Sequence, residues 1–329
     1  MGEEYYESQG AKQAAESKDA CKKITIGLWK FQIPNPENHP SFQVDVTMGP
    51  GQDWVCIGGG AIGNPQPGNF LTMSRPSLDL NGKEDWKGWA VATRDHEVAN
   101  PRKLVGVALG MKVDGLSREE LISNLKIFTE LDANPASHTE LSCYVEEGFL
   151  LLGGGFEVLD QDGGGNMATA SFPNSNYSWM ARSRDEDIPT PSRLRVFAIG
   201  ISANLMKPNP TGQPTSIGNV ETTFASSESL ASWASMATQR PLPGYALCGG
   251  GACAHFGMVR GETYADLQVD RNAPMFIWGL DPMISAQPLP TAPDQSFTGN
   301  SFMHMRPCVG TITAYAMGIK FKSDVEPVT

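Results

Sequence analysis

Trp54-Val-Cys-Ile-Gly-Gly-Gly-Ala61 is a hydrophobic strand sequence that ends in three glycines. The same pattern occurs twice more, as Phe149-Leu-Leu-Leu-Gly-Gly-Gly-Phe156 and as Tyr245-Ala-Leu-Cys-Gly-Gly-Gly-Ala252. From one triplet to the next the spacing is 95 and then 96 residues. Regular spacing over so long a chain predicts internal repeats, in which each unit buries its hydrophobic face against its neighbours.

The triplets divide the chain of 329 residues into three divergent repeats. We assign residues 23–113 to repeat 1, 114–206 to repeat 2 and 207–329 to repeat 3, after a polar N-terminal tail of residues 1–22. Repeat 3 is expected to carry an insertion at 281–308, rich in Pro, Ser and Met. A tryptophan and a closing alanine recur in the same order as the triplet: Trp89, Trp179 and Trp278, then Ala108, Ala198 and Ala316.

Each repeat has the pattern of five or six short strands. Phe42–Met48, for example, alternates apolar and polar residues, which is typical of a half-buried strand. The 35 glycines and 24 prolines have no collagen period and suit many turns. The predicted fold is all-β, with three divergent repeats of short antiparallel strands in a β-prism-like pseudo-three-fold arrangement; three tandem β-sandwiches are the alternative. The one helical turn expected lies after a capping box of Ser117 and Glu120.

The bulk composition bears on several classes of function. A net charge of −11 argues against binding to nucleic acid phosphates or an anionic membrane surface. No run of about 18 apolar residues is present, so no transmembrane segment is expected. The first residues lack the apolar region of a signal peptide, which predicts a cytoplasmic protein or one secreted without a classical leader. Six cysteines are too few for a disulfide scaffold, and free buried thiols are expected, including Cys248 and Cys253 beside the third triplet.

The glycine triplets admit two interpretations. Glycines at the end of a strand can cradle a phosphate, but that arrangement needs a following helix and usually a lysine. The residues after the triplets, such as Ala61-Ile-Gly-Asn64, do not begin a helix. We therefore expect the triplets to bend the strands and let another backbone approach closely.

The strongest candidates for a binding site follow the recurring tryptophans. Arg94-Asp-His-Glu97 and Arg184-Asp-Glu-Asp187 are predicted to be equivalent loops, replaced in repeat 3 by Leu280-Asp-Pro-Met283. Carboxylates in a loop bind sugar hydroxyls or Ca²⁺, although a solvated, salt-bridged turn is the simpler interpretation. The tryptophans are expected in the core, with a sugar-stacking platform as the alternative. The candidate ligand-binding residues are Trp89, Arg94, Asp95, His96, Trp179, Arg184, Asp185 and Asp187.

His39 and His138 occupy equivalent places in the first two repeats, within Asn35-Pro-Glu-Asn-His39 and Asn134-Pro-Ala-Ser-His138. A turn-stabilising role is expected for both, because two histidines without a third ligand do not make a zinc site. No cofactor is predicted apart from the possible Ca²⁺. No hydrolase signature accompanies a serine or cysteine nucleophile.

Parts of the repeat resemble known proteins. Gly244–Ala252, Leu71–Pro76, Gly88-Trp89 and Tyr315–Gly318 are similar to the Gly-Gly-Gly-Ala repeats of uncharacterised bacterial secreted proteins. Leu242-Pro-Gly-Tyr245 is similar to the entry of the β-prism modules of perforin-type toxins. The resemblance implies a module that recognises a surface, often through glycans or membranes.

The sequence thus predicts a non-catalytic, lectin-like recognition module that binds a glycan or cell-surface receptor multivalently through its repeated loops. A structural or toxin-associated subunit for assembly or receptor binding, which could form a homo-oligomer, is one alternative. The other is an enzyme with a site in the repeat 3 insertion, around Asp294, His304 and Arg306.

Overall fold

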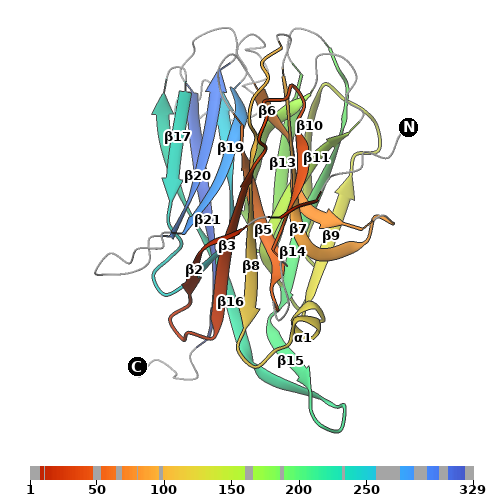
Figure 1. Ribbon diagram of the computed structural model, residues 1–329, viewed down its shortest axis with the longest axis vertical. Helices are drawn as coiled ribbons and strands as arrows, with labels where there is room; N and C mark the ends of the chain where they lie inside the picture. The colour runs from red at the N-terminus through yellow and green to blue at the C-terminus, as the bar shows by residue number, and fades with distance from the viewer. Residues whose placement is uncertain are drawn as a thin grey trace.

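A computed structural model describes most of the chain as three seven-stranded β-sheets (Figure 1). The described residues are 8–10, 12–46, 53–63, 69–79, 81–95, 99–159, 166–185, 189–231, 234–256, 275–284, 295–303 and 310–322. Neighbouring strands are antiparallel, apart from the parallel pair β1 and β4. The all-β prediction is therefore confirmed. The one described helix, α1 (Arg118–Ile122), has the predicted capping box of Ser117 and Glu120.

The strand order of each sheet gives the topology. Sheet 1 contains β1 (Ser8–Gly10), β4 (Ser41–Asp45), β7 (Glu84–Asp95), β6 (Asn69–Leu78), β11 (Phe149–Leu159), β14 (Arg193–Ser202) and β9 (Leu125–Leu131). Sheet 2 contains β10 (His138–Tyr144), β13 (Ser178–Arg184), β12 (Met167–Ser175), β18 (Ala246–Phe256), β21 (Gly310–Phe321), β16 (Pro214–Ala231) and β15 (Asn204–Pro208). Sheet 3 contains β17 (Ala234–Gln239), β20 (Gln295–Met303), β19 (Met275–Ile284), β5 (Val55–Ile62), β8 (Val105–Val113), β3 (Ile24–Gln32) and β2 (Lys12–Lys18).

Every sheet combines strands of two repeats. Each repeat divides into two three-stranded halves, and the halves lie in different sheets. Sheet 1 joins β4-β7-β6 of repeat 1 to β11-β14-β9 of repeat 2, and the other two sheets join repeat 2 to repeat 3 and repeat 3 to repeat 1 in the same order. Strand pairing thus links the three repeats in a cycle, and no repeat keeps its strands in a sheet of its own.

The first glycine of each triplet lies where β5, β11 and β18 approach one another. A Cβ atom there would lie 2.7 to 3.3 Å from the carbonyl oxygen of the residue that precedes another triplet. These contacts also form a cycle: Gly58 faces Cys248, Gly153 faces Ile57, and Gly249 faces Leu152. The close backbone approach predicted for the triplets is confirmed.

The second glycine of each triplet lies beneath a large aromatic ring from the opposite half of the same repeat. Gly59 contacts Trp89, Gly154 contacts Trp179 and Gly250 contacts Phe297. Any Cβ atom at these positions would overlap the ring. The three glycines pair across the sheet with Ala108, Ala198 and Ala316, so the closing alanines do recur in register.

The third aromatic position corrects the sequence analysis, which had assigned it to Trp278. Phe297 occupies the position of Trp89 and Trp179, whereas Trp278 lies on the preceding strand β19. The presence of a tryptophan or a phenylalanine matches the hydrogen-bond acceptor available next to the ring. Trp89 and Trp179 each donate their indole N–H over 2.9 Å to a serine hydroxyl, Ser74 and Ser171. Repeat 3 has Leu280 at the serine position, and a phenylalanine has no N–H to satisfy.

The third glycine of each triplet lies at the junction between two repeats. A Cβ atom on Gly60, Gly155 or Gly251 would overlap the backbone carbonyl of Leu280, Ser74 or Ser171, respectively. Only two residue pairs join the repeats at each junction, for example Phe156 with Ser74 and Glu157 with Met73. The triplet therefore has three distinct packing roles, repeated in three copies.

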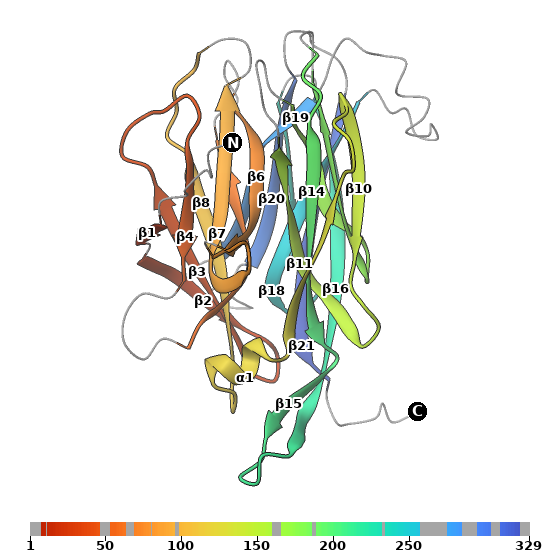
Figure 2. The same cartoon turned by 90° about the vertical axis from the view of Figure 1, so that its right-hand side faces the viewer.

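Two further features differ from the sequence analysis. The polar N-terminal tail contains strands among its described residues: β2 pairs with β3 and β1 with β4, and the buried Asp19 carboxylate accepts the backbone N–H groups of Ile24 and Phe321. Residues 281–308 are not an insertion throughout, because β20 lies inside that range and is the counterpart of β7 and β13. The segment Lys207–Pro214 forms the turn of the β15–β16 hairpin, which projects beyond the sheets (Figure 2).

Candidate functional site

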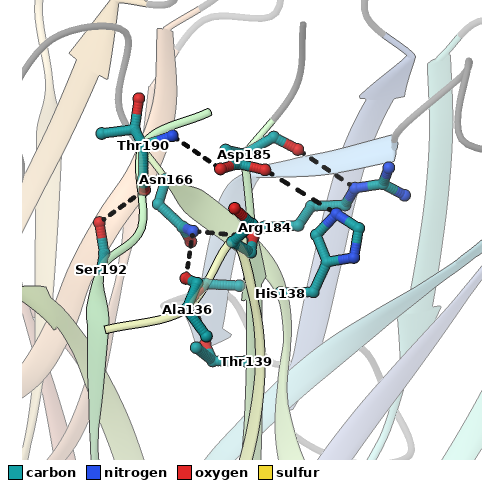
Figure 3. Close-up of polar contacts among 10 residues, drawn as sticks. Ala136, His138, Thr139, Asn166, Arg184, Asp185, Thr190 and Ser192 are labelled. Atoms are coloured by element: carbon teal, nitrogen blue, oxygen red, sulfur yellow. Dashed lines mark hydrogen bonds and ion pairs between the residues drawn. The ribbon is translucent and has the colours of Figure 1, made fainter. Parts of the chain in front are cut away.

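A polar cluster lies where β13 ends in repeat 2 (Figure 3). The Asp185 carboxylate accepts the backbone N–H of Thr190 over 2.7 Å, and its other oxygen lies 3.8 Å from Nε2 of His138. The backbone N–H of Asp185 donates to the carbonyl of Ser137 over 2.9 Å. Asn166 donates its amide to the same carbonyl over 3.0 Å. Asp185 thus links the end of β13 to the segments before β10 and before β14.

Repeat 1 contains the same cluster at the end of β7. The Asp95 carboxylate accepts the backbone N–H of Asn100 over 2.6 Å and the side-chain amide of Asn69 over 2.7 Å. The backbone N–H of Asp95 and the amide of Asn69 both donate to the carbonyl of Asn38. His39 is the counterpart of His138, since each directly follows the residue whose carbonyl accepts these bonds. The two loops predicted to be equivalent are therefore built alike at their bases.

Repeat 3 has replaced this polar pair. Asn69 pairs across the sheet with Asp95, whereas the corresponding pair in repeat 3 is Met275 with Met303. Phe302 stands at the position of Arg94. Leu280–Met283, the loop assigned to repeat 3 by sequence, instead lies on strand β19. The polar cluster is therefore present in two repeats and apolar in the third.

Both clusters lie at the same end of the molecule. Asn69 and Asn166 directly precede Phe70 and Met167, which pack with Phe276 in one small buried cluster. Phe70, Met167 and Phe276 occupy equivalent positions in the three repeats, and the rings of Phe70 and Phe276 are 4.9 Å apart. The two polar clusters therefore lie next to one shared apolar cluster.

The charged and titratable side chains of each cluster differ in their exposure to solvent. Asp95 and Asp185 are buried, Arg94 and Arg184 are half-buried, and both histidines are exposed. The pKa of His39 lies below its ordinary value because of partial burial and the positive charge of Arg94, which the Asp95 carboxylate opposes in part. Each cluster thus combines a buried carboxylate with an exposed imidazole and a half-buried guanidinium.

The other predicted site residues have different outcomes. Trp89 and Trp179 are each only 1% exposed, so the core interpretation is confirmed and an exposed stacking platform is wrong for these rings. His96 and Asp187 lie outside the described residues, as do Asp294, His304 and Arg306. The thiols of Cys248 and Cys253 are buried and unbridged, and burial raises the pKa of both, that of Cys253 to about 12.

In the part of the chain that the structure describes, no three His, Cys, Asp or Glu side chains come together as a metal site. The oxygens of Asp95 are both engaged, one by Asn69 and one by the backbone N–H of Asn100. A Ca²⁺ ion at Asp95 would therefore have to compete with both of these hydrogen bonds.

The sequence analysis missed Asn69 and Asn166. Both begin the pattern Asn-x-x-Thr-x-Ser-x-Pro, which spans 69–76 in repeat 1 and 166–173 in repeat 2. Its serine is the acceptor for the buried tryptophan, and its asparagine lies beside the buried aspartate. In repeat 3 the pattern reads Met-x-x-Trp-x-Leu-x-Pro, so the coordinated loss of both polar residues was visible in the sequence.

No helix among the described residues is long and apolar enough to span a membrane. Comparison of the chain with protein-family models and with curated proteins finds no match.

Proposed function

We propose that this protein is a non-catalytic recognition module that binds glycans at two equivalent sites. One site is formed by His39, Arg94 and Asp95, and the other by His138, Arg184 and Asp185. We further propose that the three sheets have a β-prism-like pseudo-three-fold arrangement, which sets the two sites in matching positions. Three separate tandem sandwiches would leave each repeat with sheets of its own.

The observation that carries the proposal is the recurrence of one polar arrangement in two repeats that differ elsewhere. Asp95 and Asp185 each accept the backbone N–H of the residue five positions later. Exposed histidines stand beside both carboxylates. A loop that only needed to be closed would not require an exposed imidazole at the same place in both copies.

The charge of the clusters favours sugar hydroxyls over a phosphate or a free cation. In each site the guanidinium and the carboxylate carry opposite charges, so these two groups together are close to neutral. The imidazole and guanidinium supply N–H donors; in repeat 2 the Asp185 carboxylate lies 3.8 Å from His138, and the Arg184 guanidinium donates to the Asp185 backbone carbonyl. Hydroxyl groups both donate and accept, and a few well-placed polar groups suffice to orient such a ligand.

The cyclic contacts of the glycine triplets support the β-prism-like arrangement. Each first glycine touches the residue before another triplet, and Phe70, Met167 and Phe276 meet in one cluster. Two sites held in one rigid body can bind a branched or clustered glycan together, which raises the overall affinity without a new contact.

A glycan array probed with the full chain tests the proposal. We expect binding to a related set of glycans, weakened in each single variant, His39→Ala and His138→Ala, and lost in the double variant. Leu242→Ala, an exposed residue away from both clusters, is the control and should bind like the unmodified protein. An array that stays blank with and without Ca²⁺ would contradict the proposal, and so would binding that survives the double variant.

A further inference from the structure

The first two strands of each repeat lie in two different sheets, each strand being either the last of its sheet or next to the last. The pairs are β3 and β4 in repeat 1, β9 and β10 in repeat 2, and β16 and β17 in repeat 3. Within each pair the strands contact one another across the gap between the sheets. An edge strand exposes unpaired backbone N–H and C=O groups, and proteins usually cover such edges.

In repeat 1 the N-terminal segment covers both edges. β2 runs antiparallel to β3, with Ala15 opposite Leu28 and Glu16 opposite Gly27. β1 runs parallel to β4, with Ser8 opposite Gln43. Residues 8–10 and 12–18 thereby add a strand to each of two sheets.

In repeat 3 the two strands meet directly. The Ser227 hydroxyl on β16 donates to the carbonyl of Thr238 on β17 over 2.8 Å. The β15 strand adds a further cover at the start of β16, over Pro214–Asn219. The gap between β16 and β17 is therefore closed by contacts within repeat 3 itself.

Repeat 2 differs from both. Among the described residues, β9 pairs only with β14 and β10 pairs only with β13, so each is the last strand of its sheet. Two large apolar side chains on these strands are exposed, Leu131 at 40% and Tyr144 at 63%. Among the described residues no strand pairs with the outer edge of β9 or β10, and the contact between the two strands includes the Cys143 thiol of β10 and the Glu130 backbone of β9.

We propose that the β9 and β10 edges form a strand-addition site for an extended segment of a partner protein. The segment would follow the course of residues 8–18 in repeat 1, parallel to β10 and then antiparallel to β9. Backbone hydrogen bonds supply the affinity in this mode of recognition, and alternate side chains supply the specificity.

Strand register identifies the positions that such a segment would contact. Trp29 and Phe128 are equivalent because they pair with Ala108 and Ala198, the two closing alanines. Val44 and Cys143 are equivalent because they pair with Trp89 and Trp179. The segment would therefore lie along Leu125–Thr129 of β9 and Ser142–Tyr144 of β10.

The same register defines the chemistry of the segment. Ala15 and Ser17 of β2 are buried, so small residues are required at alternate positions. Glu16 lies opposite Gly27 in repeat 1, and the equivalent residue of repeat 2 is Lys126. An acidic side chain in the partner would therefore lie opposite Lys126, and opposite charges across a strand pair are stabilising. The Lys126 ammonium pairs with the exposed Glu146 carboxylate over 2.7 Å and lies over the Phe128 ring.

A synthetic peptide with the sequence of residues 8–18 is the probe, added to the full chain and followed by calorimetry and amide hydrogen exchange. We expect saturable binding of one peptide per chain, with new protection of amides in β9 and β10. Lys126→Glu should weaken binding about two- to fivefold, and a peptide carrying Glu16→Lys should restore it to that variant. A scrambled peptide of the same composition is the control.

Three results would overturn the inference. The first is the absence of saturable binding at 1 mM peptide, on the order of the weakest useful affinity. The second is new protection confined to β3 and β4, which would mean that the peptide exchanges with the chain's own segment. The third is self-association of the chain that protects β9 without peptide. None of these outcomes depends on glycan binding, so the two proposals can fail separately.

Discussion

Gly155→Ala tests the role of the third glycine at the junction between repeats 1 and 2. A Cβ atom there would overlap the Ser74 carbonyl oxygen and lie 2.9 Å from the Arg75 Cα atom. These are backbone atoms of the paired strand, which cannot turn away as a side chain can. Overpacking of this kind costs about 1–3 kcal/mol and sometimes more.

The same junction also contains a buried ion pair, which favours a loss of stability in the upper part of this range. The Arg75 guanidinium lies 3.2 Å from the Glu157 carboxylate, and both side chains are less than a tenth exposed. Arg195 joins the same carboxylate over 3.1 Å. A shift of β6 away from β11 would weaken this pairing and leave buried charge less well compensated, which is strongly unfavourable.

Urea unfolding followed by tryptophan fluorescence measures the effect. We expect Gly155→Ala to lower the free energy of unfolding by about 2–3 kcal/mol. The matched control is Gly249→Ala, where the nearest atom to a Cβ is the Leu152 carbonyl oxygen at 3.3 Å. Alanine has less backbone freedom than glycine in the unfolded chain, which favours the folded state by about 0.5–1 kcal/mol. This gain offsets the cost of the tight contact, so stability should change little. Equal losses in the two variants, or no loss in Gly155→Ala, would refute the assignment of separate roles to the glycines.

Three further predictions follow from buried or half-buried side chains. Ser171→Ala removes the acceptor of the Trp179 indole N–H and should lower the free energy of unfolding, measured with urea, by about 1–3 kcal/mol. Adding Trp179→Phe should recover part of that loss, because phenylalanine has no N–H that needs an acceptor. Burial and the positive charge of Arg182 hold the pKa of His255 below its ordinary value of 6.5, so below that pH the unfolded chain takes up a proton more readily than the folded one and the free energy of unfolding falls. His255→Gln should flatten the stability profile below pH 6.5. Maleimide labelling with peptide mapping should modify the exposed Cys21 rapidly and the buried Cys253 only on unfolding, and fast labelling of Cys253 would contradict its burial.

Much of the fold was predictable because the recurring glycine triplets indicate positions where a side chain would not fit against its neighbours. A residue without Cβ that recurs in register implies close packing, and here all three glycines have that role in every copy. The sharing of sheets between repeats was not predictable in the same way. A strand's alternation indicates that one face is buried, but it does not identify the neighbour with which its edge pairs.

The errors have physical causes as well. Matching tryptophans by identity selected Trp278, whereas the packing position needs only a large ring over a glycine, which Phe297 provides. The strand β2 was missed because its inward residues, Ala15 and Ser17, are too small and polar to give a hydrophobic pattern. Asp95 and Asp185 were expected in open loops, but their carboxylates are used to hold the loop ends together.

The central claim is that one chain carries two equivalent glycan sites and a third position that has lost its site. Native mass spectrometry with the tightest-binding glycan from the array measures this directly as the number of ligands per chain. We predict two ligands on the unmodified protein, one on either His39→Ala or His138→Ala, and none on the double variant. Three ligands on the unmodified protein, or a number that the two substitutions leave unchanged, would contradict the account.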